Sequence, residues 1–280
     1  MTTAVDSLMT RMGAADTLVC CGLDPDVRRL PAEIVNQHAT DAERVQRFLA
    51  EVITLASPHV CAFKAQKAFF DALDGGHDIL RSVVSQIHRD HPGVPVFVDC
   101  KVGDIDNTME AYTRFILGDL GADGILVNPY MGDEVVEAFG AYQDRAVIVL
   151  ARTSNPGASI IQDVTLRDGR MLWEYVLELI VDRWNAHGNL IPVVSSTTDL
   201  DLSSIRRRIP DETPILLAGV GAQGGDYSDL RMLLNDDDIG VFVNSSRGLL
   251  YPSNPEGLPW QEAIQRSVID FKTKLNSHRR

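Results

Sequence analysis

Charged residues at the ends of several apolar segments are the strongest chemical signal in this sequence. Asp24, Lys64, Asp99 and Lys101 close three separate hydrophobic runs, so acidic and basic side chains alternate. Such a set, brought to one place, perturbs the pKa values of its members and directs an electric field at a substrate. A lysine beside two carboxylates stays charged and can donate a proton. Taken singly, each residue could equally be a solvated loop residue or a helix cap.

A glycine-rich segment, residues 219–226, predicts a binding site of a second kind. Its four glycines directly follow an apolar run, and such backbone can approach a phosphate closely and point N–H groups at it. Arg247 would add a bidentate guanidinium to the same corner. The alternative is a flexible turn beside a surface arginine. The glycine spacing does not fit a dinucleotide fingerprint, because no acidic residue ends a following strand about 20 residues on. A phosphorylated small molecule is therefore the expected ligand.

Eight short apolar runs are predicted as the strands that position these residues. They are continuously apolar, which is typical of parallel strands covered by helices on both faces. Segments of helical period separate them. Eight strands alternating with helices over about 250 residues predict one (β/α)8 barrel domain over residues 1–280, with its core at about 15–275 and an extra helix near residues 5–12. A doubly wound sheet is the alternative, but no linker or composition shift indicates a second domain. The runs are 18–23, 60–63, 94–98, 124–127, 146–150, 191–194, 215–218 and 240–243.

In such barrels the active site lies at the carboxyl ends of the strands. The polar residues that end the apolar runs are therefore expected to meet at one mouth. Asp99 and Lys101 are two apart and should point the same way from a strand. Asp104 lies beyond that strand, where a loop could aim it into the site or outward to a partner chain.

Composition excludes several classes of partner. The 280 residues are 45% hydrophobic and carry a formal net charge of -13, which argues against a broad basic surface for nucleic acid or anionic lipid. No apolar run approaches the roughly 20 residues of a membrane-spanning helix. The N-terminal segment lacks the features of a secretory signal, so a cytoplasmic location is expected.

No metal or thiol chemistry is expected either. The cysteines lack metal-ligand spacing and are predicted to be buried free thiols. The seven histidines show no paired ligand spacing. Asp24, Asp99 and Asp104 could hold Mg²⁺, but the interleaved lysines would repel it. The four cysteines are Cys20, Cys21, Cys61 and Cys100.

Several motifs resemble one family. The segment from Asp99 to Ile105, followed by Thr108, resembles the Asp-x-Lys-x-x-Asp-Ile-x-x-Thr motif of orotidine 5'-phosphate decarboxylases. Further motifs match in the right order across about residues 18–250. The segment Val127-Asn128-Pro129-Tyr130 is similar to the long, bacterial (type 2) subgroup. The further motifs are Gly22-Leu23-Asp24-Pro25-Asp26, Lys64, Ser154-Asn155-Pro156-Gly157-Ala158, residues 219–226 and Ser246-Arg247-Gly248.

The resemblance implies a homodimeric barrel with two active sites at the interface. Such an enzyme converts orotidine 5'-monophosphate to uridine 5'-monophosphate and carbon dioxide in pyrimidine biosynthesis, without metal or organic cofactor. By resemblance, Lys101 would protonate C6 of the pyrimidine and Asp99 would lie near the departing carboxylate. Lys64 and Asp104 would complete the charged network. The residues expected to reach across from the partner subunit are Asp104, Ile105 and Thr108.

The resemblance also implies the substrate contacts. Asp24 and Lys64 would hold the ribose hydroxyls, Ser154 the pyrimidine amide, and Gln223 with Arg247 the phosphate. One departure from the commoner pattern is Asn155, where many relatives carry a different polar residue beside the serine. Lys67 follows Lys64 by three residues, but the position directly after the strand favours Lys64. The substrate-binding set is completed by Asn128, Pro156, Gly224 and Ser246.

Two rival functions fit parts of the sequence. Sugar-phosphate aldolases or decarboxylases of the same superfamily are similar in the third-strand motif, but they use Mg²⁺ and carry an acidic residue where Lys64 stands. A catalytically silent nucleotide-binding protein would be expected to have lost Lys101 or its acidic neighbours, and all of them are present. Decarboxylation is therefore the predicted activity.

Overall fold

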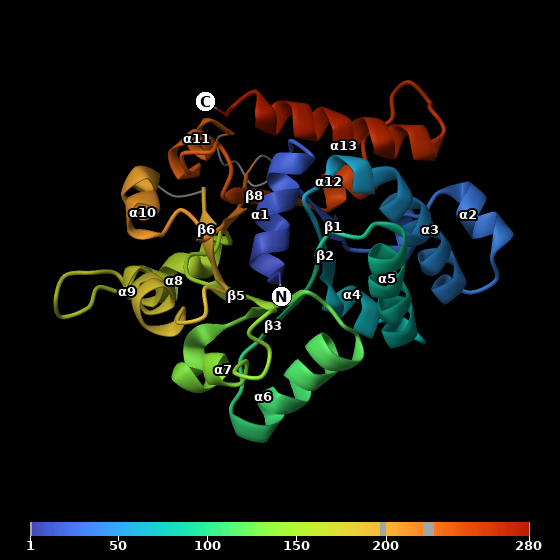
Figure 1. Cartoon of the computed structure of the whole chain (residues 1–280). Helices are drawn as coiled ribbons and strands as arrows, with labels where there is room; N and C mark the ends of the chain where they lie inside the picture. The colour runs from blue at the N-terminus through green and yellow to red at the C-terminus, as the bar shows by residue number, and fades with distance from the viewer. Residues whose placement is uncertain (1, 197–199, 221–226, 280) are drawn as a thin grey trace.

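The computed structural model describes residues 2–196, 200–220 and 227–279. Eight parallel strands form a closed barrel in the order of the chain, each paired with its neighbours and β1 with β8 (Figure 1). This confirms the predicted (β/α)8 class. The strands are β1 Val19–Leu23, β2 Ala62–Gln66, β3 Val96–Val102, β4 Gly124–Val127, β5 Ala146–Leu150, β6 Leu190–Ser195, β7 Ile215–Ala218 and β8 Val241–Ser245.

Helices surround the barrel and pack their apolar faces against its strands. In α3, Thr40 and Glu43 form a capping box, and the helix buries one apolar face from Val45 to Ala56. The α-helices of the described residues are α1 Ala4–Ala14, α2 Ala32–Gln37, α3 Asp41–Ala56, α4 Lys67–Asp71, α5 Gly76–Asp90, α6 Asp106–Thr113, α7 Asp133–Glu137, α8 Ser159–Gln162, α9 Leu172–Glu178, α10 Leu202–Arg208, α11 Leu230–Leu233, α12 Arg247–Leu250 and α13 Trp260–Asn276.

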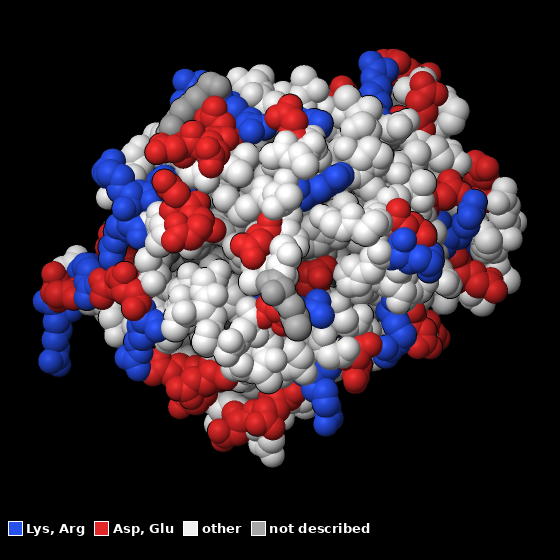
Figure 2. Space-filling view, viewed as in Figure 1, with Lys and Arg blue, Asp and Glu red and all other residues white. Residues whose placement is uncertain are grey.

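The extra N-terminal helix, α1, lies against the amino-terminal end of the barrel, opposite the strand ends that carry the predicted site (Figure 1). The Arg11 side chain donates to the carbonyls of Ser57 and Val60, just before β2. The Ala4 N–H donates to the Asp144 carbonyl, just before β5. On the face seen in Figure 2, acidic and basic side chains are interspersed and form no continuous basic patch.

The strand boundaries required one correction that bears on the site. The runs 124–127, 146–150 and 215–218 match β4, β5 and β7, but β2, β3, β6 and β8 continue past the predicted ends. Lys64, Asp99 and Lys101 therefore lie within strands and not after them. The ladder hydrogen bonds belong to the backbone, so pairing continues after side chains turn polar. Gln66 pairs with Asp99 at the last register position of β2 and β3.

Candidate active site

A chain of three charged side chains lies at the carboxyl ends of β2 and β3. Lys64 Nζ lies 2.8 Å from Asp99 Oδ2, while Lys101 Nζ lies 2.7 Å from Oδ1 and 2.9 Å from Oδ2 of the same carboxylate. Lys64 is 6% exposed and Asp99 4% exposed, whereas the Lys101 side chain is 45% exposed. The half-exposed side chain of Lys101 is thus anchored through its ammonium on a buried carboxylate.

An irregular backbone in β3 presents Lys101. The β3–β4 register shifts between Asp99 and Val102, and Lys101 has φ of +46°, which is rare for a residue with a side chain. Backbone strain of this kind concentrates at functional sites. Asp99 and Lys101 were expected to point the same way from a regular strand; their side chains do meet, but the strand between them is irregular. Gly103 is required beyond the bulge, because a Cβ there would lie 2.3 Å from the Asn128 carbonyl oxygen.

Asp24, at the end of β1, faces the same mouth. Its Oδ1 is buried without a hydrogen-bond partner among the described residues. Burial raises the pKa of Asp24, while Lys64 acts in the opposite direction. Gly22 brings this end of β1 close to the β8 loop, since a Cβ there would lie 1.9 Å from Ser246 Oγ. A buried acceptor without a partner is suited to a hydroxyl donor from a ligand.

The charges in this cluster reinforce one another. Burial alone would raise the pKa of Asp99, but the ammonium groups of Lys64 and Lys101 outweigh it and hold that pKa below its usual value. Burial alone would lower the pKa of Lys64, but Asp99 and Asp24 raise it above its usual value. Both members of the buried pair are therefore charged at neutral pH.

The lowered pKa of Asp99 predicts an acid-sensitive contribution to stability. A depressed carboxyl pKa contributes stability above the unfolded value of about 4, and this contribution is lost as the pH falls through the folded value. We expect Asp99→Asn to be less stable than the wild type at about pH 7, with a gap that narrows toward about pH 3. Denaturant unfolding at a series of pH values measures this gap. A gap of constant size would contradict the assigned charge state.

Gln66 is a neighbour of the cluster that the motif analysis missed. With its amide nitrogen turned toward Asp99, it donates to Oδ1 and Oδ2 at 3.3 Å. The predicted strand ended at residue 63, whereas β2 runs to Gln66, which lies two residues after Lys64 and so shares its face. Lys67, the alternative to Lys64, begins α4 and pairs with Asp71 at 2.7 Å instead.

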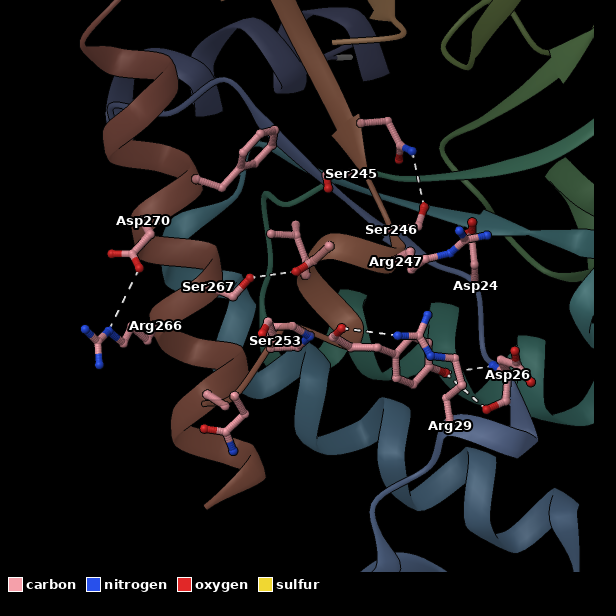
Figure 3. A pocket seen from close by; sticks show the side chains of 18 of the residues that line it. Asp24, Asp26, Arg29, Ser245, Ser246, Arg247, Ser253, Arg266, Ser267 and Asp270 are labelled. Atoms are coloured by element: carbon pink, nitrogen blue, oxygen red, sulfur yellow. Dashed lines mark hydrogen bonds and ion pairs between the residues drawn. The ribbon is translucent and has the colours of Figure 1, made fainter. Parts of the chain in front are cut away.

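A cavity of about 950 Å³ opens at this end of the barrel, and Figure 3 shows Asp24, Ser246 and Arg247 among the residues that line it. Asp24, Lys64 and Asp99 line one part of it, and Ser246 with Arg247 lines another. Arg247 is exposed at the start of α12, and no ion pair holds its side chain in the described ranges. A guanidinium in this setting suits a phosphate. Gly219 and Val220 also line the cavity, whereas Gln223 and Gly224 lie outside the described residues.

The other predicted contacts lie around the same mouth. Asn128 follows β4 and accepts a hydrogen bond from the Tyr130 N–H at 3.1 Å, and Ser154 and Pro156 lie in the loop after β5. Thr108 is exposed on α6. Asp104 Oδ1 accepts from the Ile105 N–H at 2.8 Å, and no ion pair joins it to either site lysine within the described part of the chain. The role of Asp104 stays a prediction.

The cysteines are structural in character. Cys20, Cys21 and Cys61 are buried as predicted, while Cys100 is half-buried. Burial raises the pKa of Cys20 to about 12 and that of Cys100 to about 11, so both thiols stay protonated at neutral pH. Among the described residues, no group of three or more His, Cys, Asp or Glu side chains could hold a metal ion. No helix in the described ranges is long and apolar enough to span a membrane.

The barrel and its mouth define the class of protein. Acidic and basic groups lie together at the strand ends, next to a cavity lined by an arginine that has no ion pair among the described residues. This is the arrangement of an enzyme that acts on an anionic small molecule. Comparison with known proteins gives the particular family.

The model of the Orotidine 5'-phosphate decarboxylase / HUMPS family matches residues 17–257. Orotidine 5'-phosphate decarboxylase of Bordetella petrii is 37% identical over 99% of this chain and 100% of its own length, and that of Aromatoleum aromaticum is 38% identical over 97% and 99%. The structure of Leishmania donovani OMP decarboxylase superposes with a TM-score of 0.82 at 29% identity and covers 99% of both chains. The chain belongs to the orotidine 5'-phosphate decarboxylase / HUMPS family, as its motifs predicted.

Proposed function

We propose that Lys101 is the proton donor to C6 in the reaction of this enzyme, an orotidine 5'-phosphate decarboxylase that converts orotidine 5'-monophosphate to uridine 5'-monophosphate and carbon dioxide in pyrimidine synthesis. The observation that carries this assignment is the Lys64–Asp99–Lys101 chain of contacts, in which the outer ammonium is half-exposed and fixed by both carboxylate oxygens. No other lysine in the described ranges contacts Asp99.

The chemistry explains why a fixed ammonium is needed. Loss of carbon dioxide from C6 leaves an electron pair localised on a ring carbon. An ammonium held beside that carbon stabilises the developing charge and then supplies a proton, so that a C–H bond replaces the broken C–C bond. Asp99 aims the ammonium of Lys101, and the two hydrogen bonds that its carboxylate accepts from Nζ favour this positioning role. General acid catalysis lowers the activation free energy by roughly 3–5 kcal/mol, whereas the most demanding enzyme reactions need a lowering of about 20 kcal/mol.

Binding energy from the remote phosphate is proposed to supply part of the difference. Arg247, Ser246 and the segment that contains Gln223 and Gly224 would hold the phosphate. Asp24 and Lys64 would hold the ribose, since both line the cavity and Asp24 Oδ1 is buried without a partner among the described residues. A substrate fixed at both ends holds C6 against Lys101 and excludes water from the charged cluster. No metal or organic cofactor takes part in this proposal.

The activity is tested by mixing purified protein with orotidine 5'-monophosphate in excess EDTA and following the ultraviolet absorbance. Conversion to uridine 5'-monophosphate under these conditions is the expected result. Activity that appears only on a sugar phosphate after Mg²⁺ is restored would support the metal-dependent relatives. Absence of both activities would favour a binding protein. The expected cytoplasmic location is part of the same proposal.

A homodimer is proposed to complete the site. Large apolar side chains are exposed close to the mouth of the barrel, on the segments that follow β3 and β4. Ile105 is 40% exposed, Tyr112 37% and Tyr130 80%. Exposed apolar residues gathered in this way mark interaction surfaces. Asp104, Ile105 and Thr108 would then meet the partner's substrate, which agrees with the lack of an ion pair from Asp104 to the site lysines in the described part of its own chain.

Mixing two inactive variants tests the contribution across the interface. Lys101→Ala and Asp104→Ala homodimers are each expected to be nearly inactive. If Asp104 acts in trans, random exchange of equal amounts gives hybrid dimers with one intact site each, and activity returns to about a quarter of the wild-type value. Co-expression with two affinity tags allows the hybrid to be isolated and measured. An isolated hybrid without activity would place both residues in the site of one chain.

A further inference from the structure

A polar network after β5 surrounds a buried arginine that the proposed reaction does not use. Arg152 is 2% exposed. Its Nη1 donates to Gln162 Oε1 and to the Thr153 carbonyl, both at 3.0 Å, and its Nη2 donates to Asp163 Oδ2 at 3.0 Å. A buried guanidinium is costly unless such partners surround it. The geometry of this segment is therefore tied to the contacts between Arg152 and the end of α8.

Gln162 connects this buried arginine to the loop that carries Ser154. Its Oε1 also accepts from the Thr153 N–H at 2.9 Å, and its Nε2 donates to Thr153 Oγ1 at 2.8 Å. Thr153 Oγ1 in turn donates to Asn155 Oδ1 at 2.7 Å. The two neighbours of Ser154 are thus held by hydrogen bonds. Thr153 is held through its backbone and its side chain, and Asn155 through its side-chain amide.

Apolar packing does little to hold this loop. Helix α8 buries no residue, and Ile160 on it is 78% exposed. The short helical turn before it, Pro156–Ala158, buries only Ala158. Because a loop without an apolar anchor keeps its shape through its hydrogen bonds, the contacts of Arg152 and Gln162 contribute to the position of Ser154.

We infer that Arg152, Gln162 and Thr153 form a positioning clamp that sets Ser154 for recognition of the pyrimidine. The inference rests on the proposed function and on the family resemblance, which implies that Ser154 meets the pyrimidine amide. The clamp acts through Ser154 and selects the base, while the ribose and phosphate contacts come from other strands. Removal of the clamp should therefore weaken the binding of ligands that carry the base and leave the binding of ligands without it nearly unchanged.

The experiment compares the binding of uridine 5'-monophosphate with that of ribose 5-phosphate by titration calorimetry. Gln162→Leu keeps the size of the side chain and removes its three hydrogen bonds to Thr153 and Arg152. We expect its Kd for uridine 5'-monophosphate to rise about tenfold, with a similar fall in kcat/KM, and its Kd for ribose 5-phosphate to change less than about twofold. Gln162→Glu keeps the acceptor for the Thr153 N–H and for Arg152, and should recover part of the loss.

Gln143→Leu is the matched control. Gln143 also makes a side-chain bond to backbone, to the Gly140 carbonyl, but precedes β5 at the opposite end of the barrel. It should bind both ligands as the wild type does. If Gln162→Leu binds both ligands more weakly to the same degree, or if neither Kd changes, the proposed clamp is wrong. An inactive wild type with a selective loss of uridine 5'-monophosphate binding in Gln162→Leu would reject the proposed reaction and keep the clamp.

Discussion

Lys101→Ala is expected to lower kcat for decarboxylation by about 10⁴-fold or more, because it removes both the proton donor and the charge that stabilises the carbanion. The fold should survive, since the Lys101 side chain is 45% exposed and its partner Asp99 retains Lys64 at 2.8 Å. The absorbance assay with orotidine 5'-monophosphate measures the rate. Binding of uridine 5'-monophosphate shows whether the site remains formed.

The matched control for this variant is Lys67→Ala. Lys67 lies three residues after Lys64 and pairs with Asp71, away from Asp99. It should keep nearly full activity. Substantial turnover by Lys101→Ala would remove Lys101 as the proton donor and leave Lys64 as the ammonium to be tested next.

Lys64→Met is expected to have the largest effect on stability, a loss of about 3–5 kcal/mol in the free energy of unfolding. The methionine fills a similar volume but leaves Asp99 buried with only Lys101 to balance it. Burial raises the pKa of Asp24, and the positive charge of Lys64 opposes this rise. The variant loses that positive charge. Activity should fall as well, because the carboxylate that aims Lys101 is disturbed. Denaturant unfolding and the same rate assay measure the two effects.

Lys67→Met provides the comparison for Lys64→Met. Its ion pair with Asp71 is partly exposed, with 14% of the Lys67 side chain and 44% of the Asp71 side chain accessible, so a loss of about 1 kcal/mol is expected. The double variant Lys64→Met/Asp99→Asn should recover part of the lost stability, because it no longer buries an unbalanced carboxylate. A Lys64→Met protein as stable as the wild type would show that the buried ion pair contributes no net stability.

The sequence alone determined the barrel and the residues that meet at its mouth. Eight apolar runs of the right length and spacing specify parallel strands, because strands covered on both faces must be apolar throughout. The closed barrel then brings Lys64 and Asp99 together from neighbouring strands, which a reader can infer from strand order. The motif from Asp99 to Thr108 was specific enough to predict the family that the comparisons confirmed.

The tertiary structure decided what depends on contacts between distant residues and on local backbone departures. The bulge that gives Lys101 a positive φ cannot be read from strand alternation, because the alternation rule assumes a regular strand. The same holds for Gln162, which lies nine residues after Thr153 and reaches it only because the loop folds back on α8. Strand order determines which residues meet at the mouth, whereas side-chain packing and hydrogen bonding determine their final geometry.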